Sequence, residues 1–105
     1  MSFPQEVIKE FKERIQRLYG KRLVRVILYG SWARNEARED SDIDLAVVLR
    51  DKVAPGAEID RMIDAITDIN LSHNVLISVY PVSEDDYRSL KSPLLLNLRR
   101  EGVPT

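Results

Sequence analysis

The chain has 105 residues, of which 44% are hydrophobic and 31% are charged, and its formal net charge is −1. This length is typical of one domain, so we expect residues 1–105 to form a single unit. The absence of cysteine excludes disulfide scaffolds and thiolate metal sites, and the single histidine excludes a multi-histidine zinc site. No apolar run approaches the ~20 residues of a membrane span and no signal-peptide pattern begins the chain, so we expect a cytoplasmic protein without membrane contact.

Helical periodicity, β-branched runs and turn residues predict the secondary structure along the chain. In order, the pattern predicts a helix over 2–19, a strand over 22–29, a short helix over 32–38, a strand over 42–49, a loop over 53–56, a helix over 57–71, a strand over 75–82, a helix from Ser83 through about Leu90, and a final helix from Pro93 to before Gly102. Ser2 with Gln5 fits a capping box, and Gly20 marks the end of the first helix. The order αβαβαβαα predicts a two-layer α/β domain, with helices packed on a small mixed sheet of about three to four strands.

Two carboxylates stand at the start of the second predicted strand. Asp42 and Asp44 are two positions apart, and positions two apart in a strand face the same side. Two neighbouring carboxylates repel each other unless a cation lies between them. Oxygen ligands at this spacing suit Mg²⁺ or Mn²⁺, which accept one or two carboxylates together with substrate phosphates. The alternative is a pair of solvated turn carboxylates.

The first predicted strand ends in a pair of residues that suits a phosphate. Gly30 would let a phosphate approach the backbone, and Ser31 offers a hydroxyl near the N-terminus of the next predicted helix, where anions are favoured. An ordinary strand–turn–helix junction uses the same residues. A metal–nucleotide complex needs an anion-binding turn and a carboxylate pair together, and here they lie at the ends of consecutive strands.

This stretch resembles the signature of the polymerase-β-type nucleotidyltransferase superfamily, and in particular its small minimal nucleotidyltransferase (MNT) members. The family pattern is a hydrophobic strand, Gly-Ser, roughly nine to thirteen residues, and then Asp-hydrophobic-Asp-hydrophobic. The matching residues are Tyr29-Gly30-Ser31, Ala33-Arg34 and Ser41-Asp42-Ile43-Asp44-Leu45. The resemblance implies a nucleotidyltransferase-like fold over nearly the whole chain.

The resemblance also implies an activity and a role for each matching residue. The enzyme would use Mg²⁺ (or Mn²⁺) to transfer a nucleoside monophosphate from an NTP, with ATP as the expected nucleotide, to a hydroxyl acceptor. Gly30 and Ser31 would hold the β- and γ-phosphates, and Asp42 and Asp44 would be the catalytic residues that bind the divalent ions. Arg34 would reach a phosphate, although a solvated helix arginine explains this residue equally well.

One departure from the family pattern concerns the third carboxylate. Active members usually carry an aspartate on the next core strand, and Ser78 stands at that position here, within Ile77-Ser78-Val79-Tyr80-Pro81. Serine is no general base near neutral pH. The alternative hypothesis is therefore a weakened or inactive module that acts as the antitoxin or regulatory partner of a helical HEPN-type protein. Such a partner is also implied for the active enzyme.

Other features suggest partners less strongly. His73 is more typical of a loop histidine than of an acceptor-side base. The basic residues near the end of the chain have few aromatic neighbours, so nucleic acid is not the expected partner. The last predicted helix carries leucines on more than one face, which favours burial by a partner or in a homo-oligomer; these are Leu94, Leu95, Leu96 and Leu98.

Overall fold

The first half of the chain forms a long helix followed by an antiparallel pair of strands. The computed structural model describes residues 4–89 and 92–105. Helix α1 spans Gln5–Tyr19 and the 3₁₀ turn η1 spans Gly20–Arg22, so the predicted end of the first helix at Gly20 is confirmed. Ser2 of the predicted capping box lies outside the described residues. Strand β1 (Leu23–Tyr29) and strand β2 (Ile43–Leu49) agree with the prediction to within one residue, and a single turn of helix, α2 (Gly30–Ala33), follows β1.

The second half adds one parallel strand and three helices. Helix α3 spans Pro55–His73, so it begins two residues earlier and ends two residues later than predicted, with Asn74 in the left-handed conformation at its end. Strand β3 (Ile77–Ser83) and helix α4 (Glu84–Ser89) follow, and Ser83 Oγ accepts a hydrogen bond from the Asp86 amide, as its N-cap pattern predicts. The predicted end of this helix at Leu90 lies outside the described residues. Helix α5 (Pro93–Glu101) is confirmed.

The sheet has the strand order β3-β2-β1-β4 and is mixed, which confirms the predicted mixed α/β fold class. The domain has three layers and not the predicted two, because helices pack on both faces of the sheet. Strand β1 is antiparallel to β2, and β3 is parallel to β2. The two-residue strand β4 (Val103–Pro104), which the sequence pattern does not predict, pairs with β1 at the outer edge. Two residues carry no period-2 signal, so this strand exists only because α5 returns the chain to β1.

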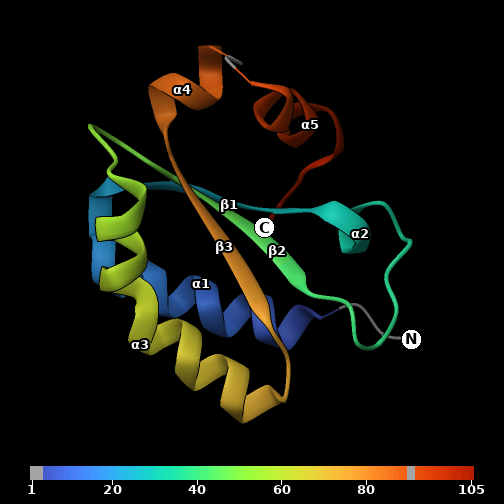
Figure 1. Ribbon diagram of the computed structural model, residues 1–105. Coiled ribbons are helices and arrows are strands. Elements are labelled where there is room, and N and C mark those ends of the chain that lie inside the picture. Colours follow the sequence, from blue (N-terminus) through green and yellow to red (C-terminus); the bar gives the residue numbers. More distant parts are fainter. Residues whose placement is uncertain (1–3, 90–91) are drawn as a thin grey trace.

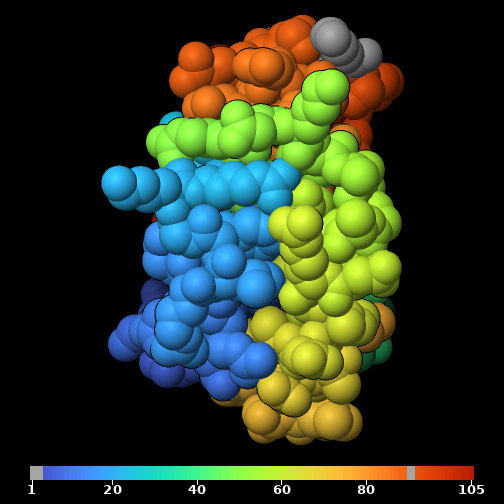
Figure 2. Space-filling view, turned by 90° about the vertical axis from the view of Figure 1, so that its left-hand side faces the viewer, coloured from blue at the N-terminus to red at the C-terminus, as the bar shows by residue number. Residues whose placement is uncertain are grey.

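Helices α1 and α3 cover one face of the sheet, and α4 and α5 lie on the other side (Figure 1). Figure 2 shows α1 and α3 side by side along the molecule. The larger core lies beneath these two helices, with Phe11 and Ile15 of α1, Met62 and Ile69 of α3, and the odd-numbered residues of β2 fully buried. The even-numbered residues of β2 therefore face the side of α4 and α5, where Ala46 and Val48 pack with Leu95 and Leu98.

The leucines of α5 divide between core and surface. Leu95 and Leu98 are buried, whereas Leu94 and Leu96 are 37% and 44% exposed. This division confirms that leucines lie on more than one face of the helix. Among the residues that the structure describes, no helix has the length and apolar character needed to cross a membrane.

Candidate functional site

The end of β1 and the beginning of β2 lie next to each other. Because the two strands are antiparallel, Tyr29 is the partner of Asp44 in the sheet, and the chain leaves β1 at Gly30 beside the point where it enters β2. Asp42 directly precedes β2 and is exposed, whereas Asp44 is half-buried within the strand. The structure thus brings together Gly30, Ser31, Asp42 and Asp44, as the spacing of the motif predicts.

Gly30 touches the carboxylate of Asp44. Its φ is +71°, in the left-handed region that glycine adopts without steric cost. A Cβ at this position would overlap Oδ2 of Asp44 and would lie 3.1 Å from its Cγ. Any side chain on residue 30 would therefore occupy the space of the Asp44 carboxylate.

The helix after Gly30 is shorter than the sequence predicts. The expected helix over 32–38 is wrong: α2 is the single turn Gly30–Ala33, and Ser31 lies inside that turn rather than at an N-cap, which is Tyr29. Asn35 ends the helix because it adopts a left-handed φ of 60°. One turn gives little macrodipole, so the polar groups available to an anion here are the backbone N–H groups and the Ser31 hydroxyl.

Arg34 lies just beyond this turn and is held by two carboxylates. Its guanidinium donates to Glu36 at 3.1 Å and to Glu101 of α5 at 3.4 Å. Glu101 is a contact that sequence reasoning missed, because the two residues are 67 positions apart. Both glutamates are exposed, so these ion pairs position Arg34 weakly.

The electrostatics of the site favour a bound cation. Burial raises the pKa of the Asp44 carboxyl, and the neighbouring Asp42 charge raises it further, while Arg34 lowers it. Burial also raises the pKa of Tyr29 to about 12, with further contributions from Asp44 and from Tyr80 of the adjacent strand. A cation between Asp42 and Asp44 would relieve this repulsion.

The two carboxylates fit a divalent ion that takes its remaining ligands elsewhere. In the described part of the chain, no group of three or more His, Cys, Asp or Glu side chains is placed to hold a metal ion. Mg²⁺ is commonly bound by one or two carboxylates plus substrate phosphates and water, so this carboxylate pair beside the turn at Gly30 suits it. Asp42 and Asp44 are the residues that would hold it.

The residue in the third position is Ser78, which is the partner of Asp44 in the parallel pairing of β2 and β3. Paired residues of neighbouring strands face the same side of the sheet, so Ser78 lies on the Asp44 face. Its side chain is exposed. Sequence reasoning identified this position, but it missed the two tyrosines beside it, Tyr29 and Tyr80, which strand alternation places on this same face.

Three other features of the chain have structural roles outside the carboxylate pair: His73, the acidic residues after Ser83, and Trp32. His73 ends α3 and contacts Glu10 of α1. The acidic residues after Ser83 form the first turn of α4, as expected. Trp32 packs against the larger core, and its Nε1 donates to the Ser41 carbonyl at 3.3 Å.

Comparison with known proteins gives a consistent set of similarities. A family model described as a nucleotidyltransferase domain matches residues 8–92. Two proteins of Methanocaldococcus jannaschii are similar in sequence. "Putative protein adenylyltransferase MJ0604" is 33% identical over 81 residues, which are 77% of this chain and 75% of that protein. "Putative protein adenylyltransferase MJ0141" is 36% identical over 73 residues, which are 70% and 73% of the two chains.

Solved structures share the fold. One described as a "putative minimal nucleotidyltransferase" is 29% identical, with a TM-score of 0.58, and the match covers 95% of this chain and 94% of that one. A toxin–antitoxin structure crystallised with AMP-PNP has a TM-score of 0.63 and 18% identity, and the match covers 90% of this chain and 68% of that one. At this identity the second similarity concerns the fold alone.

Proposed function

Because the chain belongs to the nucleotidyltransferase domain family, we propose that it transfers AMP from ATP to a hydroxyl group of a partner protein, with release of pyrophosphate. Members of this family typically use an NTP and a divalent metal ion. The observation that carries the proposal is the close approach of Gly30, at the end of β1, to the carboxylate of Asp44, because it places the turn that would hold the phosphates beside a metal-binding group.

The turn after β1 binds the phosphates of the nucleotide in this proposal. Gly30 brings the backbone of this turn against the Asp44 carboxylate, which a Cβ would not allow, and Ser31 adds a hydroxyl donor. Arg34 is close enough to lower the pKa of Asp44, and exchange of its exposed partners Glu36 and Glu101 for a phosphate would keep its charge paired. These groups orient the triphosphate so that its α-phosphorus faces the acceptor hydroxyl.

Asp42 and Asp44 supply the anionic side of the site. Their charges repel each other without a cation, so they are preorganised to bind Mg²⁺ or Mn²⁺ together with the nucleotide. The bound ion supplies charge neutralisation on the phosphates and on the departing pyrophosphate. The oxygen of the acceptor hydroxyl forms a bond to the α-phosphorus and releases its proton to solvent, while the bond from that phosphorus to the bridging oxygen breaks and its electron pair leaves with pyrophosphate.

The names of the relatives support a protein as the acceptor. Two of them are named as protein adenylyltransferases, and several solved structures of this fold are toxin–antitoxin structures. We infer that the acceptor is a separate chain, with a helical HEPN-type protein as the specific partner to test. The exposed Leu94 and Leu96 of α5 are apolar groups that such a partner would cover.

A second candidate function follows from Ser78. No carboxylate is in register with Asp44 on β3, so the described site has no base at that position to take the acceptor proton. This observation favours a module that binds a metal–nucleotide complex and its partner but transfers slowly or not at all. The two candidates differ in turnover, not in binding.

The test compares ATP labelled at the α-phosphate with ATP labelled at the γ-phosphate, in the presence of Mg²⁺ or Mn²⁺ and the candidate partner. Transfer of the α label alone to the partner supports adenylyl transfer. Binding of the nucleotide without transfer supports the second candidate. Equal ATP affinity in EDTA and in Mg²⁺, measured by calorimetry, would contradict both.

Matched variants identify the residues responsible. Asp42→Asn and Asp44→Asn should abolish metal-dependent ATP binding while the protein stays folded. Asp40→Asn is the same chemical change on an exposed residue two positions before Asp42, and it should leave binding intact. If Asp40→Asn has the same effect as Asp44→Asn, the assignment of the carboxylate pair is wrong.

A further inference from the structure

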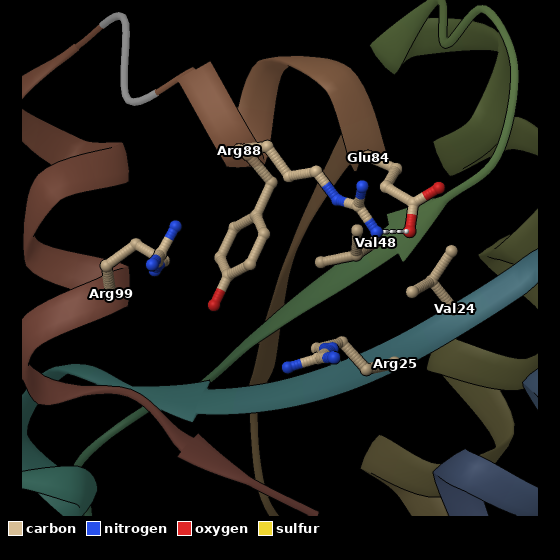
Figure 3. A pocket seen from close by; sticks show the side chains of 7 residues that line it. Val24, Arg25, Val48, Glu84, Arg88 and Arg99 are labelled. Carbon is tan, nitrogen blue, oxygen red and sulfur yellow. Dashed lines mark hydrogen bonds and ion pairs between the residues drawn. The ribbon is translucent and has the colours of Figure 1, made fainter.

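A second, positively charged pocket lies between α4, α5 and the sheet (Figure 3). It has a volume of about 320 Å³, and its lining residues are Val24, Arg25, Val48, Glu84, Tyr87, Arg88 and Arg99. Three arginines and one glutamate give this lining a formal charge of +2. The chain as a whole has a net charge of −1, so the positive charge is local.

The pocket depends on a bulge in β1. The pairing with β2 shifts between Leu23 and Arg25, so that one extra residue, Val24, is inserted into β1. Because of this insertion, the successive residues Val24 and Arg25 both line the pocket, as Figure 3 shows. The bulge thus adds Val24 to the face of β1 on which strand alternation already places Arg25.

The three arginines come from three elements, and two of them contact neighbouring side chains. Arg88 of α4 donates to Glu84 at 3.0 Å, and the Arg99 guanidinium of α5 lies over the Tyr87 ring at 5.7 Å from its centroid. Within the described residues, no ion pair includes Arg25 or Arg99. Because the Arg88 side chain is 73% exposed, its ion pair with Glu84 is weak and can be exchanged for a ligand anion.

This pocket is separate from the carboxylate pair. Arg25 and Tyr29 lie on the same face of β1, but Ile27 stands between them, and it is buried under Leu95 and Leu98 of α5. A ligand in the pocket therefore binds on the opposite side of α5 from Gly30 and Asp44.

We propose that the pocket is a second anion site, which binds a compact polyphosphate through Arg25, Arg88 and Arg99. Three guanidinium groups that line one pocket can donate to the oxygens of phosphate groups, which accept paired hydrogen bonds. A nucleic-acid strand requires an extended basic surface, whereas this surplus is confined to one pocket on a slightly acidic chain. The ligand is either free inorganic polyphosphate or the phosphate tail of a nucleotide.

Calorimetry in EDTA tests the proposal, with pyrophosphate, tripolyphosphate and ATP as probes. The protein should carry Asp42→Asn and Asp44→Asn, which remove metal-dependent binding at the other site. Arg25→Gln should then weaken tripolyphosphate binding about tenfold or more, because a charge-assisted hydrogen bond is lost. Tighter binding of ATP than of tripolyphosphate identifies a nucleotide as the source, and equal binding identifies the polyphosphate alone.

Amide spectra locate the binding event. Tripolyphosphate should shift the amide signals of Val24 and Val48 and leave those of Gly30 and Ser31 in place. Arg17→Gln, the same change on an exposed arginine of α1, is the charge-matched control and should bind normally. An unchanged affinity in Arg25→Gln, an equal loss in Arg17→Gln, shifts confined to Gly30 and Ser31, or tighter binding of a thymidine oligonucleotide would each overturn the proposal.

Discussion

The contact between Gly30 and Asp44 leaves no room for a side chain at position 30. Gly30→Ala should lower the free energy of unfolding by about 1–2 kcal/mol through the left-handed backbone alone, with a further loss from the overlap with Asp44 Oδ2. Metal-dependent ATP binding should also be lost, because the carboxylate must move. Urea denaturation and calorimetry measure the two effects.

Gly56→Ala is the matched control for this change, because a Cβ on Gly56 meets no atom within 4 Å. This variant should bind ATP normally. Normal binding in Gly30→Ala would show that the close approach of residue 30 to Asp44 does not matter for the site.

The raised pKa of Asp44 predicts how stability changes with pH. The folded protein holds this proton more tightly than the unfolded chain, so ionisation of Asp44 destabilises the fold at pH above its raised pKa. Asp44→Asn should therefore unfold at a higher urea concentration than the parent at pH 7 in EDTA. This advantage should disappear as the pH falls below 3.8, the ordinary value, where both states are protonated.

Mg²⁺ should reduce or reverse that difference, because only the parent protein binds the ion with both carboxylates. A stability difference between Asp44→Asn and the parent that does not change with pH would contradict the assigned repulsion between Asp42 and Asp44.

Ser78→Asp tests the vacant third position. Because Ser78 is exposed and in register with Asp44, an aspartate there should tolerate its charge and add an oxygen ligand for Mn²⁺. A well-placed base contributes typically about 10²–10⁴-fold, so adenylyl transfer should rise measurably. Transfer assays and Mn²⁺ titration check this. A large loss of melting temperature that Mn²⁺ does not restore would show that the position faces the wrong way.

At the scale of elements, a buried glutamate joins α1, α3 and the turn before β1. Glu58 is 4% exposed, accepts hydrogen bonds from Tyr19 at 2.8 Å and from Arg22 at 2.9 Å, and forms an ion pair with Arg22. Burial would by itself raise the pKa of Glu58, but the hydrogen bonds from Arg22 and Tyr19 outweigh it, so the pKa lies below its ordinary value. The charged form of Glu58 therefore stabilises the fold.

Arg22→Gln should lower the free energy of unfolding by about 2–3 kcal/mol at pH 7, because it leaves the Glu58 charge buried without its main partner. The stability that Glu58 contributes is present above pH 4.5 and is lost as the pH falls through its lowered pKa, so the effect of the substitution should shrink in acid. Urea denaturation at both pH values measures this.

Arg14→Gln is the control, because Arg14 pairs with Asp68 at an exposed position and should contribute only about 0–1 kcal/mol. Equal losses in Arg22→Gln and Arg14→Gln would mean that burial of Glu58 does not strengthen the network.

At the scale of the whole molecule, the sheet lies between two helical layers, and the same strands contribute residues to both hydrophobic cores. We propose that residues 1–105 fold as one cooperative domain, because both cores contain β1 and β2 and neither can form without them. Trp32 contacts the larger core and reports on it by fluorescence, while circular dichroism reports on all helices. The two signals should give one coincident unfolding transition, and separate midpoints would contradict a single domain.

Local patterns determined the secondary structure and the motif. Periodicity placed α1, the first three strands and α5, and Ser83 placed the start of α4. The pairing of Gly30 and Ser31 with Asp42 and Asp44 was also predictable, because consecutive strands joined by a short connection commonly lie side by side.

Contacts between distant parts of the chain were decided only in the tertiary structure. The alternation of a strand determines which residues share a face, but not which strand lies beside it, so only the parallel pairing of β2 with β3 places Ser78 opposite Asp44. Two further contacts depend on the return of α5 across the sheet, because α5 carries Glu101 and Arg99. One is the hydrogen bond from Arg34 to Glu101, and the other is the pocket that Arg99 lines together with Arg25 and Arg88. The packing of apolar faces determines where α5 lies on the sheet. This packing joins residues that are far apart in the sequence, so no local pattern predicts it.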